Sequence, residues 1–125
     1  MLINFKIFHI FHISFFHIDN FGQICNANVN ISQFLPVSVK FQFPPQSSIV
    51  FAAAGSFHTL FIDSMGMLYG CGRNSEGQLG LSNNMSIVPQ VTQVSSVFTP
   101  IQIVSAGSFH SIAKNVDGKI LVTGW

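Results

Sequence analysis

Two closely similar heptapeptides, identical at their first five residues, occur in this chain. Residues 54–60 read AGSFHTL, and residues 106–112 read AGSFHSI, an interval of 52 residues with no gap. The same interval relates three further pairs of residues: Ile49 and Ile101, Gly66 and Gly118, and Gly72 and Gly124. A fixed period near 50 residues is typical of propellers and solenoids, in which similar units stack on one another. The repeat therefore limits the fold to such a stack.

Each copy predicts a β-hairpin. In the second copy, Asp117-Gly118 is a favourable hairpin turn, because glycine adopts positive φ without steric cost. Leu68 and Ile120 occupy matching places on the two return strands, and we expect both to be packed. No window carries a helical apolar period, so the sequence predicts an all-β chain. The predicted strands are 59–62, 67–71, 111–114 and 119–123.

A third, divergent copy is predicted before these two. Residues 18–24 resemble the turn region 62–68 at an interval of 44. Leu35-Pro36 corresponds to Val88-Pro89, although Asn28 stands where a counterpart of Gly72 would fall. The predicted units are a divergent N-terminal repeat at 1–48, a repeat at 49–100 and the truncated start of the next at 101–125.

The segment that follows the first hairpin is the most specific in the chain. Residues 72–81 read GRNSEGQLGL. After the AGSFH hairpin, this segment resembles the signature of the RCC1 (regulator of chromosome condensation) repeat family, which runs A-G-x-x-H-[ST]-L, a glycine turn, a strand ending in W-G, and N-x-x-G-Q-L-G-x-G. Three positions depart from that signature: Cys71 and Thr123 stand where the family often has Trp, and Ser82 replaces a Gly.

The resemblance implies a β-propeller of four-stranded blades. We therefore expect an incomplete RCC1-type propeller with two to three blade-like units of antiparallel strands. The expected structural role of Gln78 is a hydrogen bond to backbone within its own loop. The glycines of the motif that we expect to shape turns and close approaches are Gly55, Gly66, Gly72, Gly77, Gly80, Gly107, Gly118 and Gly124.

Three residues are candidates for a partner-binding face. The resemblance implies that His and polar residues on one propeller face contact a small GTPase, and His58 and His110 match the His of A-G-x-x-H. Arg73, in the polar loop, is the third candidate, and its alternative is a surface or loop-stabilising role. The alternative for each histidine is a structural hydrogen bond to backbone at a blade corner. A catalytic triad needs a carboxylate that orients the histidine beside the serine, and the chain has only four carboxylates. We therefore predict no catalytic residue and no enzyme.

Other ligand chemistries are not supported. The glycines of 70–75 lack the third glycine and the βαβ unit of a dinucleotide site, and His9, His12, His17 and Cys25 match no zinc spacing, so we expect no cofactor or metal. The charged fraction is 7% and the net charge is +1, without the clustered charge that nucleic acid or a membrane surface requires.

Two features bear on the compartment. Cys25 and Cys71 are far apart and form no C-x-x-C, so we expect neither a disulfide framework nor a zinc site. The apolar residues 2–18 are interrupted by histidines, unlike a signal peptide or a membrane span. These features predict an intracellular protein of the cytoplasm or nucleus.

The sequence thus favours a protein–protein interaction module, and two roles are open for it in a complete propeller: guanine-nucleotide exchange on a small GTPase, or a docking scaffold. The alternative is a truncated or degenerate gene product without an independently folded function. Propellers have about 4–8 blades, and the chain supplies fewer.

Overall fold

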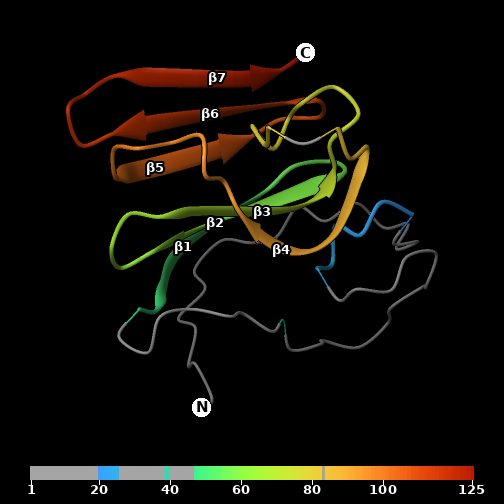
Figure 1. The fold of residues 1–125 in the computed structure, drawn as a ribbon, viewed down its shortest axis with the longest axis horizontal. Coiled ribbons are helices and arrows are strands. Elements are labelled where there is room, and N and C mark those ends of the chain that lie inside the picture. The colour runs from blue at the N-terminus through green and yellow to red at the C-terminus, as the bar shows by residue number, and fades with distance from the viewer. Residues whose placement is uncertain (1–19, 26–38, 40–46, 83) are drawn as a thin grey trace.

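The computed structural model describes residues 20–25, 39, 47–82 and 84–125. These residues form two antiparallel sheets, and β5 of the second sheet lies against β1 and β2 of the first (Figure 1). The first sheet consists of β1 (Ile49–Ala54), β2 (His58–Asp63), β3 (Leu68–Arg73) and β4 (Ile87–Gln93), in that order. The second sheet consists of β5 (Ile101–Ala106), β6 (His110–Asn115) and β7 (Ile120–Gly124).

The prediction of an all-β fold with two hairpins is confirmed. The hairpins β2–β3 and β6–β7 lie at the predicted segments, and both turns are closed by the same bond. The Gly66 N–H donates to the Asp63 carbonyl at 2.9 Å, and the Gly118 N–H donates to the Asn115 carbonyl at 3.0 Å. The 52-residue interval is therefore a repeat of backbone geometry as well as of sequence.

The strands that precede each hairpin repeat as well. β1 pairs with β2, β5 pairs with β6, and each pairing has one register shift at the matching place, between Ile49 and Phe51 and between Ile101 and Ile103. The connecting loops are also closed alike, since the Gly55 N–H donates to the His58 carbonyl at 2.8 Å. The corresponding bond of the second unit joins Gly107 to His110 at 2.9 Å.

The first sheet has an apolar core on each of its faces. The core between the two sheets consists of Leu60, Ile62, Leu68, Leu79, Val88, Val94, Ile101, Val104 and Ala113. The core on the opposite face consists of Cys25, Ile49, Phe61, Tyr69 and Cys71. The expectation that both Leu68 and Ile120 are packed is correct for Leu68 only. Ile120 is 59% exposed, because no described element covers that face of β7.

Residues 20–25 do not form the hairpin turn that the interval of 44 predicted. Their backbone instead repeats the loop after β3, at an interval of 55. Gly22 and Gly77 have φ of +73° and +75°, and Cys25 and Gly80 have φ of +60° and +67°. The Cys25 N–H donates to the Gly22 carbonyl at 2.9 Å, as the Gly80 N–H does to that of Gly77 at 2.9 Å.

A side-chain bond repeats in the same two loops. The Phe21 N–H donates to Gln23 Oε1 at 3.0 Å, and the Glu76 N–H donates to Gln78 Oε1 at 3.1 Å. The Gly-Gln-Ile of residues 22–24 is therefore the counterpart of the Gly-Gln-Leu of residues 77–79. The rest of the unit predicted at 1–48 lies almost entirely outside the described residues.

Candidate protein-interaction site

The repeated loops gather at one end of the strands. The loop 55–57 between β1 and β2, the loop 107–109 between β5 and β6, and the segment 73–80 after β3 lie at this end, which we call the motif end. The hairpin turns 64–67 and 116–119 lie at the opposite end, the turn end. Because each unit brings the same loop to the motif end, any surface built there is itself repetitive.

Equivalent side chains contact each other at the motif end. The rings of Phe57 and Phe109 stack with their centroids 5.7 Å apart and their planes at 29°. The hydroxyls of Ser56 and Ser108, which are also separated by 52 residues of sequence, lie 3.2 Å apart. The ring of Phe21 meets Phe57 edge-on, at 5.2 Å and 74°. A half-buried row of aromatic rings thus runs across the two units.

Arg73 lies over this row. Its guanidinium carbon is 5.2 Å from the ring centroid of Phe21, 5.7 Å from that of Phe57 and 5.1 Å from that of Phe109. Its Nε and Nη2 donate to the carboxylate of Glu76 at 3.0 and 2.6 Å. We call Phe21, Phe57, Phe109, Arg73 and Glu76 the aromatic–arginine cluster. Hydrogen bonds from Arg73 and then Ser75 lower the pKa of Glu76, which favours its carboxylate form.

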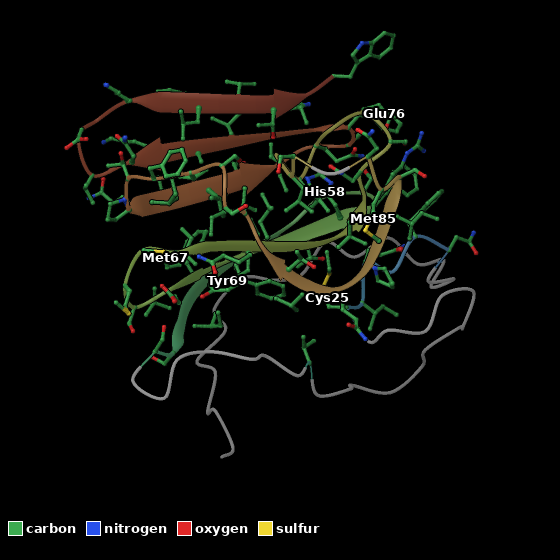
Figure 2. The ribbon with its side chains drawn as sticks, in the orientation of Figure 1. Cys25, His58, Met67, Tyr69, Glu76 and Met85 are labelled. Carbon is green, nitrogen blue, oxygen red and sulfur yellow. A yellow bond between two sulfur atoms is a disulfide. The ribbon has the colours of Figure 1, made fainter. Side chains whose placement is uncertain are left out.

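His58 lies between the two sheets (Figure 2). It is fully buried, and its Nε2 is 2.8 Å from the hydroxyl of Ser111 in the next unit. Burial, and secondly the charge of His110, lower the pKa of His58 to about 4, so the ring is neutral at pH 7. Of the two predicted roles for His58, the structure thus supports a structural one, with a side-chain hydroxyl as the partner rather than backbone.

The close approach of the two units depends on Gly55. A Cβ at this position would collide with the carbonyl oxygen of Gly107 and would stand 2.6 Å from Cε1 of His58. His58 Nδ1, on the same side of the ring, has no hydrogen-bond partner within the described part of the chain. An alanine in place of Gly55 would therefore separate the sheets at the His58–Ser111 contact.

Comparison with known proteins identifies the repeat. Two family models, both described as the regulator of chromosome condensation (RCC1) repeat, match residues 65–113 and 49–78. Together they cover residues 49–113, slightly more than half of the 125 residues. The chain belongs to the RCC1 repeat family.

Curated relatives share the RCC1 repeats over a small part of their length. The chain is similar to Protein RCC2 of Mus musculus, with 34% identity over 77 residues, which are 62% of this chain and 15% of that protein. It is similar to the E3 ubiquitin-protein ligase HERC2 of Mus musculus, with 34% identity over 80 residues, 62% of this chain and 2% of that protein. The chain therefore spans less than a fifth of either relative.

Solved structures of RCC1 proteins have a similar fold. Two crystal structures of the Saccharomyces cerevisiae RCC1 protein Prp20 match this chain with 26% sequence identity and TM-scores of 0.74 and 0.71. They cover 86% and 85% of this chain, and 26% and 27% of the matched chains. The prediction of an incomplete RCC1-type propeller is confirmed.

The predicted contact residues of the RCC1 repeats lie in different surroundings. His110 is exposed at the motif end, and Arg73 is partly exposed there within the aromatic–arginine cluster. His58 is covered by the second unit. Sequence reasoning missed Phe57 and Phe109, although their recurrence at an interval of 52 beside each histidine was the available signal.

Gln78 makes the predicted hydrogen bond within its loop, to the Glu76 N–H, and its own carbonyl accepts a bond from the Thr123 hydroxyl at 3.0 Å. The glycines of the motif lie in the turns and loops described above, except Gly72 and Gly124, which lie where β3 and β7 pass close to the backbone at His58 and His110. Among the described residues, no group of three His, Cys, Asp or Glu side chains could hold a metal, and no helix is long and apolar enough to cross a membrane.

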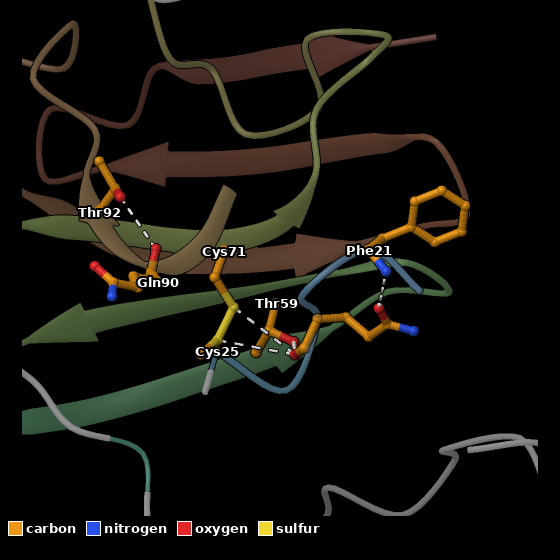
Figure 3. The surroundings of a disulfide bond; sticks show 7 residues. Phe21, Cys25, Thr59, Cys71, Gln90 and Thr92 are labelled. Carbon is orange, nitrogen blue, oxygen red and sulfur yellow. Dashed lines mark hydrogen bonds between the residues drawn. A yellow bond between two sulfur atoms is a disulfide. The ribbon is translucent and has the colours of Figure 1, made fainter. Parts of the chain in front are cut away.

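The expectation that the two cysteines stay apart is wrong. Cys25 and Cys71 form a disulfide with a Cα–Cα distance of 5.5 Å across 46 residues of sequence (Figure 3). Loop 20–25 docks on the outer face of the first sheet, and this docking brings the thiols together. The number of residues between two cysteines does not show whether folding brings their units together.

Proposed function

We propose that this chain is a protein–protein interaction module that binds its partner through the motif end of its RCC1 repeats. The observation that carries the proposal is the aromatic–arginine cluster, which combines stacked rings with an ion pair. Interfaces are enriched in aromatic residues and arginine, and these residues supply much of the binding energy. His110, exposed beside Phe109, is the third polar contact that we assign to this surface.

The class of partner that we propose is a small GTPase, bound by a complete propeller that contains these repeats. The matched yeast protein Prp20p is described by its binding to Gsp1p and histones, and the RCC1 resemblance implies an exchange factor. Exchange requires only that the surface binds the nucleotide-free GTPase better than the loaded one, so the module needs no catalytic residue of its own. We accordingly propose a non-enzymatic role in the cytoplasm or nucleus.

The test is a binding titration of the full-length protein against a nucleotide-free and a GDP-loaded small GTPase. We expect tighter binding to the nucleotide-free form and faster GDP release. Phe109→Ala and His110→Ala should weaken binding by about tenfold each, as interface contacts worth about 1.4 kcal/mol do.

Matched controls come from the turn end. Met65 and Val116 are exposed by 56% and 59% on the two hairpin turns, so Met65→Ala and Val116→Ala should leave binding unchanged. Equal binding of the two GTPase states would eliminate the exchange function. Loss of binding in the turn-end variants alone would place the interface at the other end of the strands.

A further inference from the structure

The structure contains two equivalent junctions that differ in chemistry. In the first, loop 20–25 docks on the first sheet, and in the second, the loop after β3 docks on the second sheet. The positions held by Cys25 and Cys71 in the first junction are held by Gly80 and Thr123 in the second. The junctions can therefore be compared position by position.

The two pairs of positions are structurally equivalent. Thr123 Oγ1 donates to the Gln78 carbonyl at 3.0 Å, and Cys71 Sγ lies 3.7 Å from the Gln23 carbonyl oxygen. A Cβ built on Gly80 would stand 3.3 Å from Cγ2 of Thr123. Any side chain at the position of Gly80 thus meets the side chain on the neighbouring strand. Cysteines at both positions are consequently within bonding reach.

The backbone of the first loop favours a cross-link for a second reason. Cys25 has φ of +60° and is the one non-glycine residue with positive φ among those that the structure describes. A residue with a Cβ adopts this region at a cost that glycine at position 80 does not have. The covalent bond holds Cys25 in this conformation, so without the bond the docked loop is less favoured than its counterpart.

The cross-link also lies beside the aromatic–arginine cluster. Phe21 is four residues before Cys25, and its ring contacts both Phe57 and Arg73. Besides the disulfide and these ring contacts, the Thr59 hydroxyl donates a hydrogen bond to the Gln23 carbonyl of the docked loop at 2.8 Å (Figure 3). Undocking the loop would therefore remove one ring from the cluster.

We propose that Cys25 and Cys71 form a redox-controlled cross-link that fixes loop 20–25 on the first sheet when oxidised and releases it when reduced. The co-reactant is a low-molecular-weight disulfide such as oxidised glutathione. One cysteine thiolate attacks it and releases one small thiol, and the second cysteine attacks the mixed disulfide and releases the other. The protein loses two electrons and two protons, and the small disulfide gains them. Excess dithiol reverses both steps.

This proposal accounts for a disulfide in a chain whose sequence favours a reducing compartment. Cytosolic disulfides are mostly transient or redox-sensing rather than permanent. Cys25 and Cys71 are 5% and 0% exposed, so each exchange requires a local opening of the loop. The proposal does not rest on the function proposed above, and its test involves no binding partner.

The test is hydrogen exchange of the full-length protein after oxidation with glutathione disulfide and after reduction with dithiothreitol. The Cys25 N–H and the Gly80 N–H make the same bond in the two loops, so the second amide is an internal control. Reduction should lower the protection of the Cys25 amide by at least about tenfold and leave the Gly80 amide unchanged.

Two variants complete the design. C25S/C71S should show the low protection of the reduced protein under both conditions. C25G/C71T, which copies the second junction, should keep loop 20–25 protected under both conditions. Equal protection of the Cys25 amide before and after reduction would overturn the proposal. If both thiols could still be alkylated after treatment with excess glutathione disulfide, the proposal would be overturned as well.

Discussion

The two repeat units present the same strand faces to different surroundings. Leu60 on β2 is 1% exposed, whereas its counterpart Ile112 on β6 is 39% exposed. Leu68 on β3 is 8% exposed, whereas Ile120 on β7 is 59% exposed. The backbone hydrogen bonds of the two units are nearly identical, so the difference does not arise within the units. It arises because the second sheet covers the first, and no described element covers the second.

The comparison of the two units separates strand pairing from burial. Pairing between β-strands depends on local residues, turns and register, and these recur every 52 residues. Burial depends on the neighbour that packs against the face, which the unit itself does not contain. Equivalent residues should therefore have equal effects on backbone geometry and unequal effects on stability.

The largest difference is expected in the apolar core. Leu60→Ala removes a side chain from the core between the sheets and should lower the free energy of unfolding by about 2–5 kcal/mol. Ile112→Ala at the matching exposed position should change it by no more than about 0.5 kcal/mol. Urea unfolding followed by circular dichroism measures both. Equal losses would show that the face of β6 is covered in solution.

The next difference is expected in how His58 and His110 affect the pH dependence of stability. The pKa of His58 is lowered from its model-peptide value of 6.5 to about 4, so below pH 6.5 the unfolded chain binds a proton that the folded chain does not. Stability should therefore fall as the pH drops from 6.5 towards 4, by about 2 kcal/mol between pH 7 and pH 5. Unfolding in urea at these two pH values measures the loss.

His58→Gln should abolish most of this pH dependence, whereas His110→Gln, at the exposed counterpart, should retain most of it. A variant of His58 with the full pH dependence of the natural protein would assign the titration to other groups.

An effect of similar size is expected for the hydroxyl that pairs with His58. Ser111→Ala leaves the buried Nε2 of His58 without its partner and should cost about 1–3 kcal/mol. Ser108→Ala removes an exposed hydroxyl that bonds to its counterpart Ser56, and should cost less than about 0.5 kcal/mol. Thermal unfolding of the two variants side by side distinguishes a bond between units from a surface contact. Indistinguishable melting temperatures would contradict the assignment.

The smallest effect is expected at Arg73, whose counterpart in the second unit is Trp125. The N–H groups of both donate to the carbonyl of the phenylalanine of their own unit, at 2.8 and 2.9 Å. Arg73→Leu removes the cation–π contacts and should cost about 0.5–1 kcal/mol. Trp125 is 91% exposed, and Trp125→Leu should change stability by less than about 0.5 kcal/mol. A larger loss at Trp125 would reveal a packed environment for its ring.

Sequence reasoning anticipated the hairpins and the family because their signals are local. The turns need glycine at Gly66 and Gly118, and the loop signature needs Gly77 and Gln78 at a fixed spacing. It misaligned residues 20–25, because a turn and a loop that both contain a glycine two positions before an apolar residue resemble each other over so short a segment. Only the matching φ angles and hydrogen bonds distinguish the two alignments.

The candidate site was anticipated in part. Arg73 and His110 do lie at the motif end, and their predicted contact with a partner remains a prediction. His58 shares the motif of His110 but not its exposure, because the adjacent unit supplies Ser111 and covers the ring.

The sequence by itself determined the period, the strand pairing within each unit and the conformation of the repeated loops, because turn residues and β-pattern act over a few neighbouring residues. The tertiary structure alone decided the disulfide, the stacking of Phe57 on Phe109 and the burial of His58. Each of these joins residues of different units, whose approach depends on how whole sheets pack and not on any short segment.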